Sequence, residues 1–349
     1  MITIILFSNS NLSIPTAHSY AILSFFHHLS SVNQNAYLIA PKLPASFAPS
    51  CHSLETSLGS LRYFNLLRFV LKIKPHIIVT RHFYFSFVLK LFTCARVYVE
   101  LHHLPSSLPL KIFFRLGIID HFFVISKALF DELAVNGVKS SISSSKGSAY
   151  PNLLIPTRHN RHGVVFIGQP TVFKGFDFFL MLCKSTPSLD FYFYPQQNID
   201  MQTMPDLLDI KNLHILNSYS DHRELIQALA THRIGIIPPR VSPMLSFDSR
   251  GRKCDISRYT SPLKFYDYCS AALRILAPLD GNSFHEYTHY HSVELLESND
   301  VLLWSRTIIS LYHRHPLSTH DPMFIQSGTW EAKARQYLSL GHLDKRVIS

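Results

Sequence analysis

Several hallmarks of common protein classes are missing from this 349-residue sequence. It has five cysteines but no CxxC pair, which argues against a zinc site and for a reducing compartment. No Asp-x-Asp occurs, so we expect no metal-bridged diphosphate. No apolar run reaches the roughly eighteen residues needed to cross a bilayer. Met1–Phe7 lacks the basic leader of a signal peptide, and we therefore expect a cytoplasmic protein.

Acidic residues are scarce in the first half of the chain. Residues 1–155 hold 13 Lys and Arg against 5 Asp and Glu, whereas the remainder holds 20 against 18. The cations of residues 61–116 are interleaved with Phe, Leu and Ile, as in helices that lie on an anionic membrane surface. The alternative is a set of ordinary buried helices whose Lys and Arg reach solvent. We expect a peripheral membrane contact through residues 61–116. We expect no nucleic-acid binding, because no basic-aromatic motif or groove helix is evident.

Glycine is absent from Ser8–His18, the loop after the first expected strand, so the dinucleotide fingerprint is missing and a nicotinamide enzyme is not expected. Short apolar runs alternate with helical patterns along both halves, which predicts an α/β fold with two doubly wound parallel sheets. Ligands of such sheets bind beyond the carboxyl ends of the strands. In the first half, strands are expected at Ile2–Phe7, Ala36–Ile39, His76–Val79, Val97–Glu100 and Phe122–Ile125. In the second half, strands are expected at Gly163–Gly168, Phe191–Tyr194, Leu213–Leu216, Ile234–Ile237 and Arg274–Ala277.

The stretch Arg258–Pro278 predicts a capped helix followed by a strand. Thr260 or Ser261 caps a helix that starts at Pro262, and the backbone N–H groups at such a start suit a phosphate. Lys264 opposes the helix dipole unless an anion binds there. Asp267 lies one turn further on the same face, where a carboxylate suits ribose hydroxyls. The alternative is a capped surface helix with a solvated Lys.

This stretch resembles the signature of family 4 glycosyltransferases with the GT-B fold, in which Ser-Pro-x-Lys-x-x-Glu-Tyr precedes an Ala-rich turn and a strand. Two positions depart from the signature, since Asp267 replaces a Glu and Tyr259 replaces the family's first acid. The resemblance extends along the chain through Pro15–Tyr20, Glu100–His103, Asp120–Ser126, Tyr150–Asn152, Gly163–Gly175 and Thr329–Arg335.

The resemblance implies a GT-B architecture of two doubly wound Rossmann-like domains that face each other across a cleft. Residues 1–155 would form the acceptor-side domain and residues 156–325 the nucleotide-sugar-binding domain. Residues 326–349 would add a terminal helix that packs back on the first domain. The Ser-rich stretch 140–146 and the polar stretch 156–162 predict the linker between the domains.

The implied activity is retaining, metal-independent transfer of a sugar from a nucleotide sugar to a glycan or lipid-linked acceptor, in cell-surface polysaccharide or lipopolysaccharide biosynthesis. No cofactor is implied besides the nucleotide-sugar substrate. His18 and His102 match the catalytic positions, and Gln169 replaces an Arg of the expected diphosphate site. The implied donor-binding residues are Gly168, Gln169, Lys174, Arg258, Thr260, Ser261, Leu263, Lys264 and Asp267. The alternative is a catalytically degenerate GT-B module that binds a nucleotide or glycan without transfer.

Overall fold

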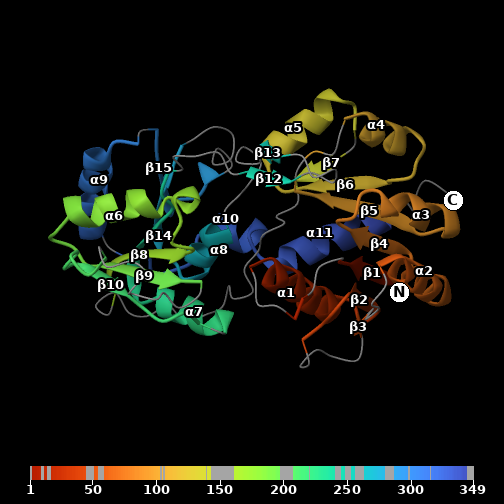
Figure 1. The fold of residues 1–349 in the computed structure, drawn as a ribbon, viewed down its shortest axis with the longest axis horizontal. Helices are drawn as coiled ribbons and strands as arrows, with labels where there is room; N and C mark the ends of the chain where they lie inside the picture. The colour runs from red at the N-terminus through yellow and green to blue at the C-terminus, as the bar shows by residue number, and fades with distance from the viewer. Residues whose placement is uncertain are drawn as a thin grey trace. The chain divides into compact units, whose positions relative to one another are not determined.

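The structure is a computed structural model that describes residues 2–8, 12–13, 17–44, 51–53, 59–102, 104, 107–138, 140–142, 161–196, 207–219, 221–239, 245–247, 253–255, 263–279, 287–297, 299–314 and 316–343. The chain divides into two compact units. Unit 1 comprises Met1–Ala149, Asp248–Gly251 and Ser327–Ser349, and unit 2 comprises Tyr150–Phe247 and Arg252–Gln326. Figure 1 shows the elements of both units along the chain.

Unit 1 contains a seven-stranded sheet of strand order β3-β2-β1-β4-β5-β6-β7, in which every neighbouring pair is parallel. Its strands are β1 (Ile4–Phe7), β2 (Ala36–Ala40), β3 (Cys51–Ser53), β4 (Ile77–Thr80), β5 (Arg96–Leu101), β6 (His121–Val124) and β7 (Ser140–Ile142). Its helices are α1 (Ala17–Val32), α2 (Gly59–Ile73), α3 (Phe85–Phe92), α4 (Ser107–Arg115), α5 (Lys127–Val135) and α11 (Trp330–Leu343).

The apolar runs of unit 1 form the expected strands because both faces of a parallel sheet are covered. All four residues of β1 and of β4 are buried. Ser126, two residues after the end of β6, caps α5, since its side chain accepts a hydrogen bond from the Leu129 N–H. The stretch 140–146 was expected to be linker throughout, and this is wrong at its start. Ser140–Ile142 forms the edge strand β7, whose backbone pairs with β6 although its side chains are mostly small and polar.

Helix α11 belongs to unit 1 although it comes last in the sequence. It packs beside α1, as Figure 1 shows, and shares a core with β1, β2 and β4. The Phe25 ring of α1 lies 6.2 Å from Trp330 and 5.2 Å from Tyr337, and Tyr337 stacks on Phe123 of β6 at 3.7 Å between centroids. These aromatic contacts hold α11 against the first half of the chain.

Unit 2 contains a six-stranded parallel sheet of strand order β10-β9-β8-β11-β14-β15. Its strands are β8 (His162–Gly168), β9 (Phe191–Pro195), β10 (Leu213–Ile215), β11 (His232–Ile236), β14 (Arg274–Pro278) and β15 (Val293–Leu296), and β12 (Leu245–Phe247) pairs separately with β13 (Lys253–Asp255). Its helices are η2 (Val172–Lys174), α6 (Phe176–Ser185), α7 (His222–Leu229), α8 (Leu263–Ser270) and α9 (Val301–His313), and α10 (Pro322–Ser327) leads out of the unit.

Alternate residues of β8 face the two layers of helices in unit 2. Val165 and Ile167 pack with residues of α7 and α8, whereas Val164 and Phe166 pack with residues of α6 and α9. The sheet is therefore covered on both faces, and its carboxyl edge is the place where polar groups can gather. Among the helices in the described part of the chain, none is long and apolar enough to span a bilayer.

Candidate functional site

The carboxyl end of β8 is shaped by two glycines with positive φ. Gly168 ends the strand with φ of 133°, and Gly175 follows η2 with φ of 74°. A Cβ on Gly175 would lie 2.7 Å from the Pro238 Cβ and 2.8 Å from the Pro239 carbonyl oxygen. Only a residue without a side chain fits there, so the turn after β8 packs tightly on the segment after β11.

Lys264 of α8 reaches over this end of the sheet. Its ammonium nitrogen lies 4.0 Å from the centroid of the Phe166 ring, and a Cβ built on Gly168 would lie 3.8 Å from the same nitrogen. The structure thus brings Lys264 and Gly168 together, as the sequence predicts for a diphosphate site. An ammonium above an aromatic face is worth about 0.5–2 kcal/mol. That contact holds the cation at the carboxyl edge of the sheet, where ligands bind in this fold class.

Tyr268 fixes the position of α8. It is fully buried, and its hydroxyl accepts a hydrogen bond from the Ile167 N–H at 3.2 Å and donates to the Ile236 carbonyl at 3.0 Å. The ring lies directly against Gly235, where an added Cβ would come within 2.6 Å of it. One side chain therefore ties α8 to both β8 and β11, and this holds Lys264 in place.

Asp267 accepts a hydrogen bond from the imidazole Nε2 of His222 at 2.9 Å. His222 is the first residue of α7, whose N-cap Asp221 accepts from the Arg223 N–H. Burial lowers the pKa of His222, but the charge and hydrogen bond of Asp267, with Asp221, outweigh burial and place the pKa above its ordinary value. The pair combines a carboxylate acceptor with an imidazole donor, a combination that suits hydroxyl groups.

A second cation predicted for the donor site lies in the turn after β8. Lys174 is the last residue of η2 and is half-buried, whereas Gln169 is exposed directly after the strand. Leu263 is the first residue of α8, but its side chain lies outside what the structure describes. Arg258, Thr260 and Ser261, with the expected cap and helix start, lie outside the described residues.

In unit 1, the carboxyl end of β5 carries a buried carboxylate with four hydrogen-bond partners. One Glu100 oxygen accepts from Arg81 at 2.5 Å and from His102 Nε2 at 2.8 Å. The other accepts from the Lys333 ammonium at 2.7 Å and the Tyr337 hydroxyl at 2.8 Å. Glu100 therefore orients His102 and joins β5 to α11.

The charges of this cluster shift the pKa values of Glu100 and Lys333. Burial raises the pKa of Glu100, but Arg81, Lys333 and His102 outweigh burial and hold that pKa well below its ordinary value. Burial lowers the pKa of Lys333 to about 8, since the attraction of Glu100 is smaller and Arg81 repels the ammonium. Glu100 is thus a carboxylate at neutral pH, so the His102 Nε2 that contacts it carries a proton.

The two histidines predicted to be catalytic differ in what the structure describes. His102 lies at the carboxyl end of β5, where ligands of this fold class bind. His18 is the second residue of α1, but nothing of its side chain is described. Among the described residues, no group of three or more His, Cys, Asp or Glu side chains is arranged to hold a metal ion.

Sequence reasoning missed His222 and Lys333 as members of these clusters. Each is far along the chain from its partner, by 45 residues for His222 and Asp267 and by 233 for Lys333 and Glu100. The sequence did contain a weak signal for Lys333, because it follows the Trp330 of the expected terminal helix at a spacing that places both on one face. It contained none for His222, whose position at a helix start looks like that of many polar residues.

The fold of the chain indicates its structural class. Two doubly wound Rossmann-like domains with parallel sheets constitute the GT-B fold of glycosyltransferases. No family model and no curated protein matches the sequence.

Solved structures with the same fold cover nearly the whole chain. The chain is similar to HepE of Anabaena in complex with UDP, with 12% identity over 97% of this chain and 99% of HepE and a TM-score of 0.69. It is similar to a glycosyltransferase of Rickettsia africae, with 13% identity over 97% of each chain and a TM-score of 0.66. It is also similar to the lipopolysaccharide outer core galactosyltransferase WaaB, with 10% identity over 98% of this chain and all (100%) of WaaB and a TM-score of 0.63.

Proposed function

We propose that this protein is a nucleotide-sugar-dependent glycosyltransferase. The observation that carries the proposal is the convergence of Lys264, Gly168 and the Asp267–His222 pair at the carboxyl edge of the unit 2 sheet. A glycine that lets a ligand approach the backbone, a cation beside it and a carboxylate one turn away match the needs of a nucleoside diphosphate. HepE, which has the same fold, was solved with UDP.

In this proposal Lys264 and Lys174 bind the diphosphate of the donor, and the backbone at Gly168 approaches it closely. The start of α8 adds backbone N–H donors, as helix starts do for phosphates. Asp267 accepts hydrogen bonds from the ribose hydroxyls, with His222 holding its carboxylate in position. The proposed donor site thus contains cations and backbone dipoles, and the diphosphate needs no metal bridge.

The proposed chemical step is transfer with retention of configuration. The bond between the sugar C1 and the phosphate oxygen breaks while the acceptor oxygen bonds to C1 on the same face. The acceptor proton passes to the departing phosphate oxygen, so the products are a glycosylated acceptor and a nucleoside diphosphate. The cations at the donor site stabilise the charge that develops on that phosphate. His102, oriented by Glu100, is proposed to contact the transferred sugar, and His18 to act beside it.

The acceptor is proposed to be a glycan or a lipid-linked saccharide of the cell surface. WaaB, which shares the fold, is a lipopolysaccharide outer core galactosyltransferase. Helices α2 and α3 expose Phe64, Leu71, Leu91 and Phe92 to solvent. Their sequences contain cations and no acidic residue. This surface supports the proposal that residues 61–116 make a peripheral contact with an anionic membrane.

The experiment that tests donor binding is calorimetry with a panel of nucleoside diphosphates and nucleotide sugars. Lys264→Ala should lower the affinity for whichever nucleotide binds by roughly tenfold or more, which corresponds to about 1.4 kcal/mol. The matched control is Lys184→Ala, since Lys184 is exposed on α6 of the same unit. Equal melting temperatures of the two variants would assign the loss to the site. No binding across the panel would refute the proposal.

The degenerate module is the second candidate, and two observations favour it. Gln169 stands where the resembled family has an Arg. Asp267, whose side chain is shorter than the family's Glu, already accepts a hydrogen bond from His222. A module would bind the nucleotide sugar yet release no nucleoside diphosphate from it, with or without acceptor. Release of the diphosphate that depends on Lys264 would identify the enzyme.

A further inference from the structure

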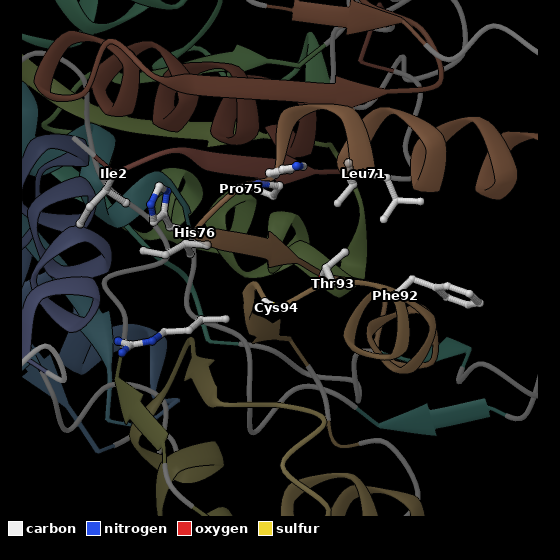
Figure 2. A pocket seen from close by; sticks show the side chains of 11 residues that line it. Ile2, Leu71, Pro75, His76, Phe92, Thr93 and Cys94 are labelled. Carbon is white, nitrogen blue, oxygen red and sulfur yellow. The ribbon is translucent and has the colours of Figure 1, made fainter. Parts of the chain in front are cut away.

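A hollow of about 490 Å³ lies in unit 1 at the amino-terminal ends of β1, β4 and β5. Figure 2 shows Ile2 and His76 toward one end of it and Leu71 and Phe92 toward the other, with Pro75, Thr93 and Cys94 between them. Its volume falls within the range of about 300–1,000 Å³ that small-molecule sites occupy. The hollow is therefore large enough for a ligand of its own.

The hollow is separate from the candidate reaction site. Arg96, the first residue of β5, lines it, whereas Glu100 and His102 lie at the other end of the same strand. Ligands of the GT-B reaction are expected beyond the carboxyl ends of the strands. The hollow is thus not the place where the donor or the sugar acceptor is expected to bind.

The chemistry of the hollow is apolar with a positive edge. Val70, Leu71, Ile77 and Phe92 supply aliphatic and aromatic walls. Among the described residues that line the hollow, the charged ones are Lys74 and Arg96, and none is a carboxylate. Leu71 is 45% exposed and Phe92 is 55% exposed, so the apolar wall continues onto the surface of α2 and α3.

Lys74 occupies a position where glycine is usual. It follows the last residue of α2 with φ of 49°, and its N–H bonds to the Val70 carbonyl. A non-glycine residue there carries backbone strain. The Lys74 side chain lines the hollow and carries one of its two cations.

We propose that this hollow binds one acyl chain of an anionic membrane phospholipid, with the phosphate held by Lys74 and Arg96 and the chain lying along Leu71 and Phe92. The occupant needs both an anion and a chain, because the walls are apolar and the charges are positive. Each CH₂ group that enters an apolar site tightens binding about fourfold. This inference does not depend on whether the protein transfers sugar.

Cys94 gives a local readout, because its thiol is free, exposed and part of the lining. The probe is dodecyl phosphate below its micelle concentration, and the signal is the rate at which Cys94 is alkylated, located by peptide mass spectrometry. We expect saturable protection of Cys94 by dodecyl phosphate, weaker protection by the shorter decyl phosphate, and little from inorganic phosphate or dodecyl maltoside. Equal protection by inorganic phosphate or by the uncharged maltoside would overturn the proposal.

Two variants test the residues. Lys74→Gly removes the cation at a φ that glycine adopts without strain, and Phe92→Gln removes the apolar wall from an already exposed position. Each should weaken protection about fivefold or more, whereas the exposed Lys184→Gln and Val135→Gln, both outside the lining, should not. Protection that survives both test variants would place the amphiphile elsewhere and overturn the proposal.

Whether the acyl chain comes from a membrane lipid is tested with vesicles of equal parts phosphatidylcholine and phosphatidylglycerol. Co-sedimentation of the protein with these vesicles should fall about fivefold or more in Lys74→Gly and remain unchanged in Lys264→Ala, which lacks one of the proposed donor-site cations. Binding of dodecyl phosphate without vesicle binding would show a site for free amphiphiles and would overturn the membrane assignment. Loss of donor binding in Lys264→Ala with unchanged vesicle binding would show that the two sites are distinct.

Discussion

The buried cluster around Glu100 makes the sharpest prediction about stability. Replacing Lys333 with Met removes the ammonium but keeps most of the side-chain volume. Glu100 then keeps Arg81, which is partly exposed, while one of its oxygens loses a buried cationic partner. Leaving a buried acceptor without one of its hydrogen-bond donors costs about 1–3 kcal/mol. Lys333 is 1% exposed and Glu100 is 4% exposed, so little solvent is present to replace the lost contact.

The measurement is urea unfolding followed by tryptophan fluorescence. The chain has two tryptophans, of which Trp330 belongs to unit 1 and Trp304 to unit 2. In a Trp304→Phe background, the signal of Trp330 reports on α11 next to the cluster. At pH 7 Lys333→Met should lower the free energy of unfolding by about 1–3 kcal/mol, because the buried carboxylate loses one hydrogen-bond donor.

A double-mutant cycle decides whether the loss comes from the ion pair. Glu100→Gln leaves Lys333 and Arg81 without their shared anion, whereas Glu100→Gln combined with Lys333→Met leaves no buried charge unpaired at that contact. The double variant should be more stable than the sum of the single losses by about 1 kcal/mol or more. Additive losses would refute the reasoning, because the two side chains would then contribute independently.

The same cluster predicts a pH dependence with a defined sign. The pKa of Lys333 is about 8 in the folded chain and 10.5 as its ordinary value. Between these values the unfolded chain binds more protons than the folded chain, so stability rises with pH. Raising the pH by one unit from 8 should stabilise unit 1 by about 1 kcal/mol, and Lys333→Met should abolish that gain.

Three further predictions concern unit 2. Tyr268→Phe should destabilise it by about 1–2 kcal/mol, because the buried hydroxyl that joins α8 to two strands is lost, and donor affinity should fall with it, as thermal melts and calorimetry would show. Gly175→Ala should cost roughly 2 kcal/mol or more, since alanine is strained at this φ and would clash with Pro238 and Pro239; an unchanged melting temperature would contradict the packing. Asp267→Asn removes the charge that raises the pKa of its imidazole partner, so its stability deficit in melts should be larger below pH 6.5 than above it.

The sheets were predictable from the sequence because buried parallel strands are continuous apolar runs. The run ending at Gly168 and the run 274–277 lie where expected, with β8 and β14 differing by only a residue. The short edge strands β3 and β7 were not predicted. Ser140–Ile142 has the composition of a loop, and its strand conformation comes from backbone pairing with β6, which the side-chain pattern does not record.

The candidate site was predictable only as far as local spacing reaches. Lys264 and Asp267 share a helix, so their spacing of three residues gave their common face before any fold was known. Contacts that depend on tertiary packing were not available in this way. Lys264 contacts Phe166 and Asp267 pairs with His222 across separate elements. No regular spacing in the sequence connects these residues, so the sequence pattern did not predict the contacts.

The two ends of β5 carry two different chemistries, and their separation is itself a prediction. Arg96 begins the strand at the apolar hollow, and Glu100 lies four residues later among the groups that orient His102. At about 3.3 Å per residue these positions are about 13 Å apart, beyond the range of about 7–10 Å within which substitutions usually couple. Lys74→Gly and His102→Ala should therefore act additively on the free energy of unfolding, within about 0.5 kcal/mol. His102→Ala should leave the protection of Cys94 by dodecyl phosphate unchanged. Coupling well above that limit would mean that the two ends of β5 are energetically linked, and the hollow and the candidate reaction site would then not be independent.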